Sequence, residues 1–328
     1  MPPQSHIIWE NDMTIKKKNK LNYSRYGLYF IAPFFIVYFI FSLIPLISTI
    51  YYSFFEYYLK LGLTQVGPNF ILFDNYIQIF SEGILFKYAL NTMIMWIMGF
   101  LPQIILSLLL ALWFTSTRLK IKATGFFKTI MYMPNLVMAS AFSMLFLKIF
   151  EANGPVINML MESGFLNESF NFLENTIATR SIIALMNFLM WFGNTTILLM
   201  AGIMGIDQTI IESASVDGAN SRQIFLKIIL PLLKPILLYV MITSLIGGIQ
   251  MFDIPQILTE GGGGPALTTK TMIMYLHDLI SSSSNYGLAG AVSVILFIIT
   301  GLLSLVIFRV FKNNDMVDLQ SSARKEVK

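Results

Sequence analysis

Cysteine is absent from the 328 residues of the chain, and histidine occurs only at His6 and His277. The lack of cysteine excludes disulfides, thiolate nucleophiles and cysteine-ligated metals. Two distant histidines also exclude a histidine-based metal site, so neither a metal nor a cofactor is expected within the chain. Charge is scarce too, because Asp, Glu, Lys and Arg make up 12% of the residues, against roughly 25% in soluble domains.

Apolar side chains make up 55% of the residues, and the mean hydropathy is +0.69. In water such a chain would expose large apolar patches, which soluble monomers rarely tolerate. The composition therefore excludes a disordered protein and an ordinary cytosolic enzyme. The charged residues, whose net charge is +4, lie in clusters separated by long uncharged stretches. We therefore expect membrane lipid around the chain and no nucleic-acid partner.

Several charge-free runs are long enough to cross a bilayer. A spanning helix needs about 20 apolar residues, because in lipid every backbone N–H and C=O must be paired internally. No run alternates in the manner of a membrane barrel strand, so the sequence predicts an all-α polytopic membrane protein with six transmembrane helices. The six runs are 26–55, 88–117, 129–147, 181–206, 235–252 and 279–308.

The distribution of positive charge predicts the orientation of these helices. With six spans, both termini and the loops 118–128 and 207–234 share one side, which holds 17 of the 22 Lys and Arg residues. The positive-inside rule places that side in the cytoplasm of a cell membrane. The first run has 30 residues and no cleavage site after it, so a retained helix is expected. The predicted parts are cytoplasmic segments 1–25 and 312–328 around a transmembrane domain 26–311.

The connection 207–231 predicts a helix, a glycine turn and a second helix. Asp207 is a suitable N-cap for the first helix, and Asn220 or Ser221 for the second. Gly218 can adopt the left-handed conformation that ends a helix. The pair could simply rest on lipid as interfacial amphipathic helices.

A more specific interpretation follows from the residue types in this connection. They resemble the EAA motif of binding-protein-dependent ABC importer permeases, which reads E-A-A, then D-G, a phenylalanine and L-P. Ser213 replaces the central alanine of the motif, which is an exchange of one small residue for another. The motif positions are Glu212, Ser213, Ala214, Asp217, Gly218, Ala219, Phe225, Leu230 and Pro231.

Three further segments resemble the carbohydrate branch of these permeases. They are the G-P-x-I-N-x-L stretch 154–160, the F-D…L-T stretch with its glycine run at 252–265, and the small residues Gly287, Ala289 and Ala291. The run Gly261–Gly264 is longer than the usual pair, and the loop 148–180 is too short for the extra outer domain of the maltose permease.

The resemblance implies a type I ABC importer permease fold and a chain that is not itself an enzyme. It implies a heterodimer with a second permease subunit, two cytoplasmic ABC ATPase subunits that use ATP-Mg, and an extracytoplasmic solute-binding protein. That protein would deliver a carbohydrate, for which an oligosaccharide is the first candidate. The motif residues would dock on the ATPase, with Glu212 pairing with an arginine. No phosphate-binding G-x-x-x-x-G-K-[ST] loop occurs in this chain.

Polar residues within the spans indicate a substrate path, because they are costly in lipid and usually face a cavity. Asn187, Trp191 and Asn194 share one helical face through their i, i+4, i+7 spacing. Aromatic and amide side chains of this kind suit a sugar, although they could equally bond neighbouring helices together. The candidate substrate residues are Asn187, Trp191, Phe192, Asn194, Gln250, Phe252 and Asp253.

Two alternative functions stay open at this point. The same fold could import a non-sugar solute such as a polyol, a glycerol-phosphate diester or a short peptide. An ion-driven secondary transporter is the other alternative. Such transporters usually carry inverted repeats and a buried acid or base at the membrane midplane, and neither is evident in the sequence.

Overall fold

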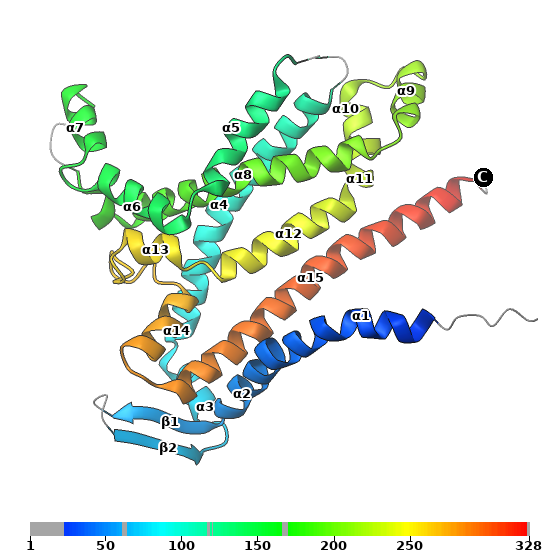
Figure 1. Ribbon diagram of the computed structural model, residues 1–328. Coiled ribbons are helices and arrows are strands. Elements are labelled where there is room, and N and C mark those ends of the chain that lie inside the picture. Colours follow the sequence, from blue (N-terminus) through cyan, green and yellow to red (C-terminus); the bar gives the residue numbers. More distant parts are fainter. Residues whose placement is uncertain (1–22, 61–63, 117–118, 120, 166–169, 327–328) are drawn as a thin grey trace, which may run out of the picture. The chain divides into compact units, whose positions relative to one another are not determined.

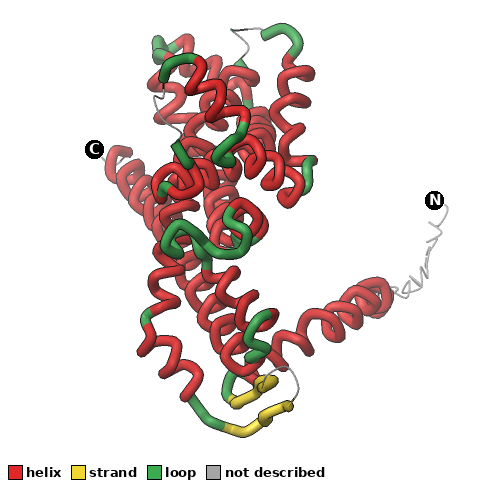
Figure 2. The backbone as a smooth tube through the Cα atoms, turned by 90° about the vertical axis from the view of Figure 1, so that its left-hand side faces the viewer, coloured by secondary structure: helices red, strands yellow, loops and turns green. Residues whose placement is uncertain are grey.

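The computed structural model describes residues 23–60, 64–116, 119, 121–165 and 170–326, so most of the predicted segment 1–25 lies outside the described residues. Helices dominate the described chain, as the backbone tube shows (Figure 2). The chain divides into two compact units, Met1–Ser48 and Thr49–Lys328.

The prediction of a polytopic helical membrane protein is confirmed. Among the described residues, five helices are long and apolar enough to cross a membrane, and a bent helix pair brings the number up to six. The five are Tyr26–Tyr52, Ile84–Thr115, Thr176–Met204, Lys234–Leu258 and Tyr286–Lys312.

The first span stays continuous although it contains prolines. It consists of α1 (Tyr23–Tyr38), the π-helical turn Phe39–Leu43 and α2 (Ile44–Tyr52). The turn closes with the bond from the Ile44 N–H to the Phe39 carbonyl, and Pro45 follows directly. Widening the helix by one residue is a common way to relieve the misfit that a proline causes.

The third predicted span, 129–147, is not one straight helix. It divides into α5 (Thr124–Leu136) and α6 (Ala139–Phe150), which α7 (Pro155–Glu162) follows, and the two parts meet at 90°. Pro134 lies in the last turn of α5, and Val137 and Met138 are extended, with ψ of 135° and 134°. The proline weakens the helix just before the break.

The last span begins later than expected from the run 279–308. Residues up to Ser281 belong to α14 (Met272–Ser281), and α15 runs from Tyr286 to Glu326. Asn285 separates the two helices, and its side-chain oxygen accepts a hydrogen bond from the Leu288 N–H at 3.0 Å. The segment 312–328, predicted as a tail, therefore continues α15 as far as Glu326.

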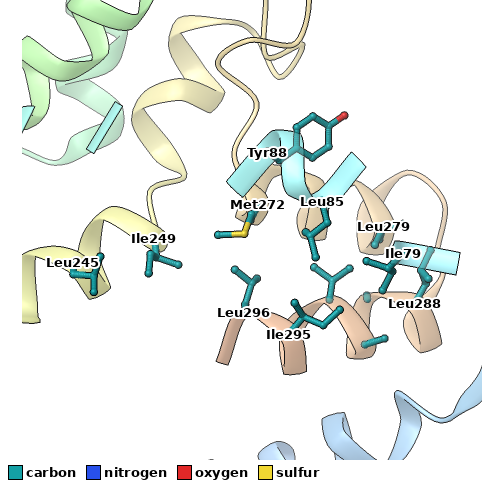
Figure 3. Close-up of a cluster of buried hydrophobic side chains, with 13 residues drawn as sticks. Ile79, Leu85, Tyr88, Leu245, Ile249, Met272, Leu279, Leu288, Ile295 and Leu296 are labelled. Atoms are coloured by element: carbon teal, nitrogen blue, oxygen red, sulfur yellow. The ribbon is translucent and has the colours of Figure 1, made fainter. Parts of the chain in front are cut away.

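A buried hydrophobic cluster lies within the second unit, Thr49–Lys328. Side chains from α3 (Asp74–Glu82), α4 (Ile84–Thr115), α12 (Lys234–Ile249), α14 and α15 converge in it (Figure 3). The labelled residues are Ile79, Leu85, Tyr88, Leu245, Ile249, Met272, Leu279, Leu288, Ile295 and Leu296.

One hairpin departs from the all-helical prediction. β1 (Phe55–Lys60) pairs antiparallel with β2 (Thr64–Phe70), beside the start of α15 (Figure 1). Phe55 lies opposite Phe70, with ring centroids 5.3 Å apart. Aromatic side chains favour strands and stabilise cross-strand pairs, which explains why the helix ends at Tyr52 and not at the end of the charge-free run.

Close backbone contacts hold α4, α5 and α8 (Thr176–Met204) together, and α8 packs on both of the others (Figure 1). A Cβ atom at Gly193 would overlap the backbone carbonyl group of Met131. A Cβ at Gly99 would come within 2.9 Å of the Ala184 carbonyl oxygen. Glycine is therefore required where these helices cross.

We expect Gly193→Ala to destabilise the protein by about 1–3 kcal/mol, because the added methyl group can be accommodated only by moving two backbones apart. The measurement is the thermal unfolding midpoint of the protein purified in detergent. Gly125→Ala in α5 is the control, since no atom of the described chain lies within 4 Å of a Cβ there. Equal midpoints for the two variants would contradict the close crossing.

Candidate functional site

A cavity of about 270 Å³ lies between α4, α8 and α12. Aromatic side chains and uncharged polar groups form much of its wall. None of the described residues that line it is Asp, Glu, Lys, Arg or His. The wall can therefore offer ring faces, amides and hydroxyls, but no fixed charge.

Three of the predicted substrate residues line this cavity, namely Asn187, Trp191 and Asn194. The Asn187 amide donates to the Ile183 carbonyl at 2.9 Å, so its own helix already uses one of its donors. Trp191 is 47% exposed. No hydrogen bond within the described chain engages the Asn194 amide, which leaves its donors and its acceptor available.

The other four predicted residues do not line the cavity. Phe192 is half-buried on a neighbouring face of α8. Gln250 is the exposed C-cap of α12, and Asp253 is exposed in the first turn of α13 (Asp253–Leu258). Phe252 lies against the ring of His277, with centroids 5.0 Å apart. These last three residues follow the end of α12 at Ile249, and among residues 250–253 it is Met251 that lines the cavity.

The residues that α4 and α12 contribute to the cavity wall were not predicted from the sequence. In α4 the signal was present, because Trp96, Phe100 and Gln103 repeat the i, i+4, i+7 spacing found in α8. In α12 the lining residues Tyr239, Thr243 and Gly247 recur at every fourth position and so share one helical face.

Some polar groups of this wall bond helices to each other. The Gln103 Nε2 donates to the Thr195 Oγ1 at 2.7 Å, and both residues are buried. Just beyond the cavity, the Ser107 hydroxyl donates to the Phe192 carbonyl at 2.9 Å. These contacts fix α4 against α8, which is the role that the alternative interpretation gave to polar residues in the spans.

The glycine-rich loop after α13 is tied to α4 and α8. The Arg180 guanidinium donates to the Thr268 carbonyl from Nε at 3.0 Å and from Nη2 at 2.9 Å, and to the Asn91 side-chain oxygen at 2.8 Å. Asn91 is buried and donates in turn to the Leu267 carbonyl at 2.9 Å. These bonds hold Leu267 in a left-handed conformation, with φ of 60°, which costs a non-glycine residue about 1–2 kcal/mol.

At the other end of α12, the segment 207–231 begins with the predicted cap. The Asp207 carboxylate accepts a hydrogen bond from the Thr209 N–H at 3.0 Å and precedes α9 (Gln208–Val216). This backbone hydrogen bond, with a second one from the Thr209 hydroxyl, lowers the pKa of the Asp207 carboxyl below its usual value. The cap is therefore charged at neutral pH and favourable at the positive end of the helix.

The predicted glycine turn is also present. Gly218 has a φ of 85°, and the Ala219 N–H bonds the Ala214 carbonyl at 2.9 Å in a Schellman arrangement. Asn220 then caps α10 (Ser221–Ile224) through a reciprocal pair of bonds with Gln223, at 2.9 and 2.8 Å. The predicted helix, glycine turn and second helix are therefore confirmed.

Two motif residues of this segment, Glu212 and Phe225, line a groove of about 880 Å³ that is bounded by α9, α10 and the ends of α4 and α8. Phe225 opens a π-helical turn, Phe225–Ile229, and Leu230 and Pro231 belong to α11 (Leu230–Leu232). The remaining motif positions Ser213, Ala214, Asp217, Gly218 and Ala219 form the end of α9 and its turn.

Comparisons with known proteins agree with this geometry. The model of the family described as "Binding-protein-dependent transport system inner membrane component" matches residues 103–315. A lactose transport system permease protein of Rhizobium radiobacter is 28% identical over 296 residues, which cover 90% of this chain and 97% of that protein. A multiple sugar-binding transport system permease protein of Streptococcus mutans is 29% identical over 303 residues, which cover 92% and 99%.

The solved structures that resemble this chain show its fold. A bacterial ABC transporter involved in the import of the acidic polysaccharide alginate matches with a TM-score of 0.73 at 22% identity, covering 89% of this chain and 97% of that one. The alginate transporter in complex with a pentasaccharide-bound periplasmic protein matches with a TM-score of 0.70.

Removing the cap of α10 should loosen the segment 207–231. We expect Asn220→Ala to cost the start of α10 about 1 kcal/mol, because the Gln223 N–H loses its side-chain acceptor. Hydrogen exchange of the amides of α10 should accelerate by about five-fold. Ser221→Ala is the control, since no side-chain hydrogen bond of Ser221 is present in the described structure. Unchanged exchange in Asn220→Ala would contradict the cap.

Proposed function

Because the chain belongs to the family of binding-protein-dependent transport system inner membrane components, we propose that it is the permease subunit of a carbohydrate ABC importer. In this role it does not hydrolyse ATP. It provides a path through the membrane, and the solute that follows the path is an oligosaccharide or a smaller neutral sugar.

The uncharged cavity between α4, α8 and α12 is the observation that carries this proposal. Sugars bind through aromatic rings packed on their C–H faces and through amides and hydroxyls bonded to their own hydroxyl groups. Trp96, Trp191 and Asn194 supply both kinds of contact. The names of the relatives support the same class of substrate, since they include lactose and multiple sugar-binding transport systems.

A phosphorylated solute and an ion-driven mechanism fit the cavity less well than a neutral sugar does. A phosphorylated solute would favour cationic side chains, and an ion-driven transporter would favour a buried acid or base. The described lining residues include neither. Arg180, which is near the start of α8, is occupied by the loop carbonyl of Thr268.

We assign the segment 207–231, the coupling segment, to contact with an ATPase subunit. Two ATPase subunits would use ATP-Mg beneath a heterodimer of this chain and a second permease, with both termini of this chain on the same cytoplasmic side. In support, α9 presents exposed Glu212 and Val216, the latter 87% exposed. Glu212 is the residue we expect to pair with an arginine of the ATPase.

The coupling segment leads directly into the wall of the cavity. Only Leu233 separates α11 from α12, and α12 contributes Tyr239 and Thr243 to the lining. A force applied to the coupling segment would therefore reach the cavity through one continuous stretch of chain. A solute-binding protein would deliver the sugar at the opposite end of α12.

Uptake into proteoliposomes tests the function. The vesicles would contain this chain, the second permease and the ATPases, with ATP inside and the solute-binding protein outside. The probes are radiolabelled lactose, maltose, trehalose, arabinotriose and an alginate trisaccharide. We expect ATP-dependent import of at least one neutral sugar and at least ten-fold slower import of alginate. Import of none of the neutral sugars, or import without the ATPases, would refute the proposal.

Gly218→Arg should uncouple transport while leaving the chain in the membrane. The left-handed backbone at Gly218, with φ of 85°, costs a residue with a side chain about 1–2 kcal/mol. The added bulk and charge would also lie on the proposed ATPase contact. We expect import to fall at least ten-fold at an unchanged amount of inserted protein.

A matched control separates coupling from backbone strain. Gly164 also has a positive φ, of 76°, and none of the described atoms lies within 4 Å of a Cβ there. Gly164→Arg should import sugar at close to the parental rate. The coupling assignment is wrong if normally inserted Gly218→Arg protein imports as fast as that control.

A further inference from the structure

Trp96 in α4 is held in place by two residues of α12. Its indole N–H donates to the Ser244 hydroxyl at 3.1 Å. A Cβ atom at Gly248 would overlap the pyrrole part of the indole ring. The ring can therefore lie directly against the α12 backbone, one turn of helix beyond its hydrogen-bond partner.

A third contact comes from α4 itself. The rings of Trp96 and Phe100 are stacked, with centroids 5.2 Å apart and planes 13° from parallel. Phe100 is 6% exposed and cannot easily move. Stacking limits the tilt of the indole, and the hydrogen bond limits its rotation, so the two contacts together leave one orientation for Trp96.

The second tryptophan of the cavity, Trp191, makes fewer contacts than Trp96. Within the described chain, Trp191 makes neither a hydrogen bond nor a ring contact, and it is 47% exposed. Both rings line the same cavity, yet of the two it is Trp96 that has a hydrogen bond and a stacked ring to fix its orientation. Preorganised groups bind more tightly, because they lose less conformational freedom on binding.

We propose that Ser244 and Gly248 are positioning residues that fix Trp96 as the ring surface on which the C–H face of the sugar packs. This inference rests on the proposed function. An aromatic surface contributes to sugar binding only while it faces the solute, and two α12 residues set that direction. Because α12 follows the coupling segment, the same contacts link the position of this surface to that segment.

The test uses the reconstituted complex and the radiolabelled neutral sugars named above. At sugar concentrations below saturation, Ser244→Ala should lower import about five-fold, which is the factor expected for one neutral hydrogen bond. Ser244→Thr retains a hydroxyl group and should restore most of the rate. Ser293→Ala is the control, since among the described residues the Ser293 hydroxyl bonds only the Ala289 carbonyl of its own helix, at 2.9 Å.

Gly248→Ala tests the second contact. The added methyl group must displace the indole ring, so we expect at least a ten-fold loss of import. Gly301→Ala in α15 is the matched control, because no atom lies within 4 Å of a Cβ there. Membrane levels and ATPase activity, measured for every variant, separate loss of sugar binding from loss of folding.

A double-mutant cycle distinguishes positioning from a general structural role. Trp96→Phe keeps a ring but has no N–H to donate, so Ser244→Ala should cause no further loss in that background. A five-fold loss that persists in Trp96→Phe, or parental import by Ser244→Ala, would overturn the inference. If the parental complex imports none of the neutral sugars, the proposed function itself is refuted, and this inference with it.

Discussion

Inside a bilayer an unpaired backbone N–H or C=O finds no water, and this constraint determines where the chain can bend. Two of the interruptions found here have partners for backbone groups that they release. In the π-helical turn before Pro45, the Ile44 N–H donates a hydrogen bond to the Phe39 carbonyl. Where α12 ends, the Met251 carbonyl accepts a hydrogen bond from the Thr271 hydroxyl at 2.9 Å. Helices, with a few paired interruptions, thus form the frame on which everything else depends.

The cavity follows from how three of these helices meet. Glycine at the crossing of α8 with α5 brings backbones into contact, and buried polar bonds such as Gln103 to Thr195 keep α4 and α8 in register. With the helices fixed in this way, the aromatic and amide groups that make no bond between helices can face a solute. The same residue types therefore serve two roles, and the hydrogen-bond partner of each side chain decides which role it has.

Local patterns were the most predictable part of the molecule. The caps at Asp207 and Asn220 and the turn at Gly218 depend on residues close in sequence, so the spacing alone predicts them. The contacts of Trp96 depend on a partner far along the chain, since Ser244 lies 148 residues later, and no local pattern predicts them. Gln250, Phe252 and Asp253 were predicted from their place at the end of a span, and they lie outside the cavity, beyond the end of α12 at Ile249.

The most direct test of the central claim, that the coupling segment receives the work of an ATPase, is a cross-link. The chain has no cysteine, so a single one at Val216, which is 87% exposed on α9, would be the only thiol of this subunit. In the importing complex, a short bifunctional reagent should join that thiol to an ATPase subunit, and a cysteine at Val306 in α15 should not be joined. An actively importing complex in which the Val216 position never cross-links to an ATPase would contradict the claim.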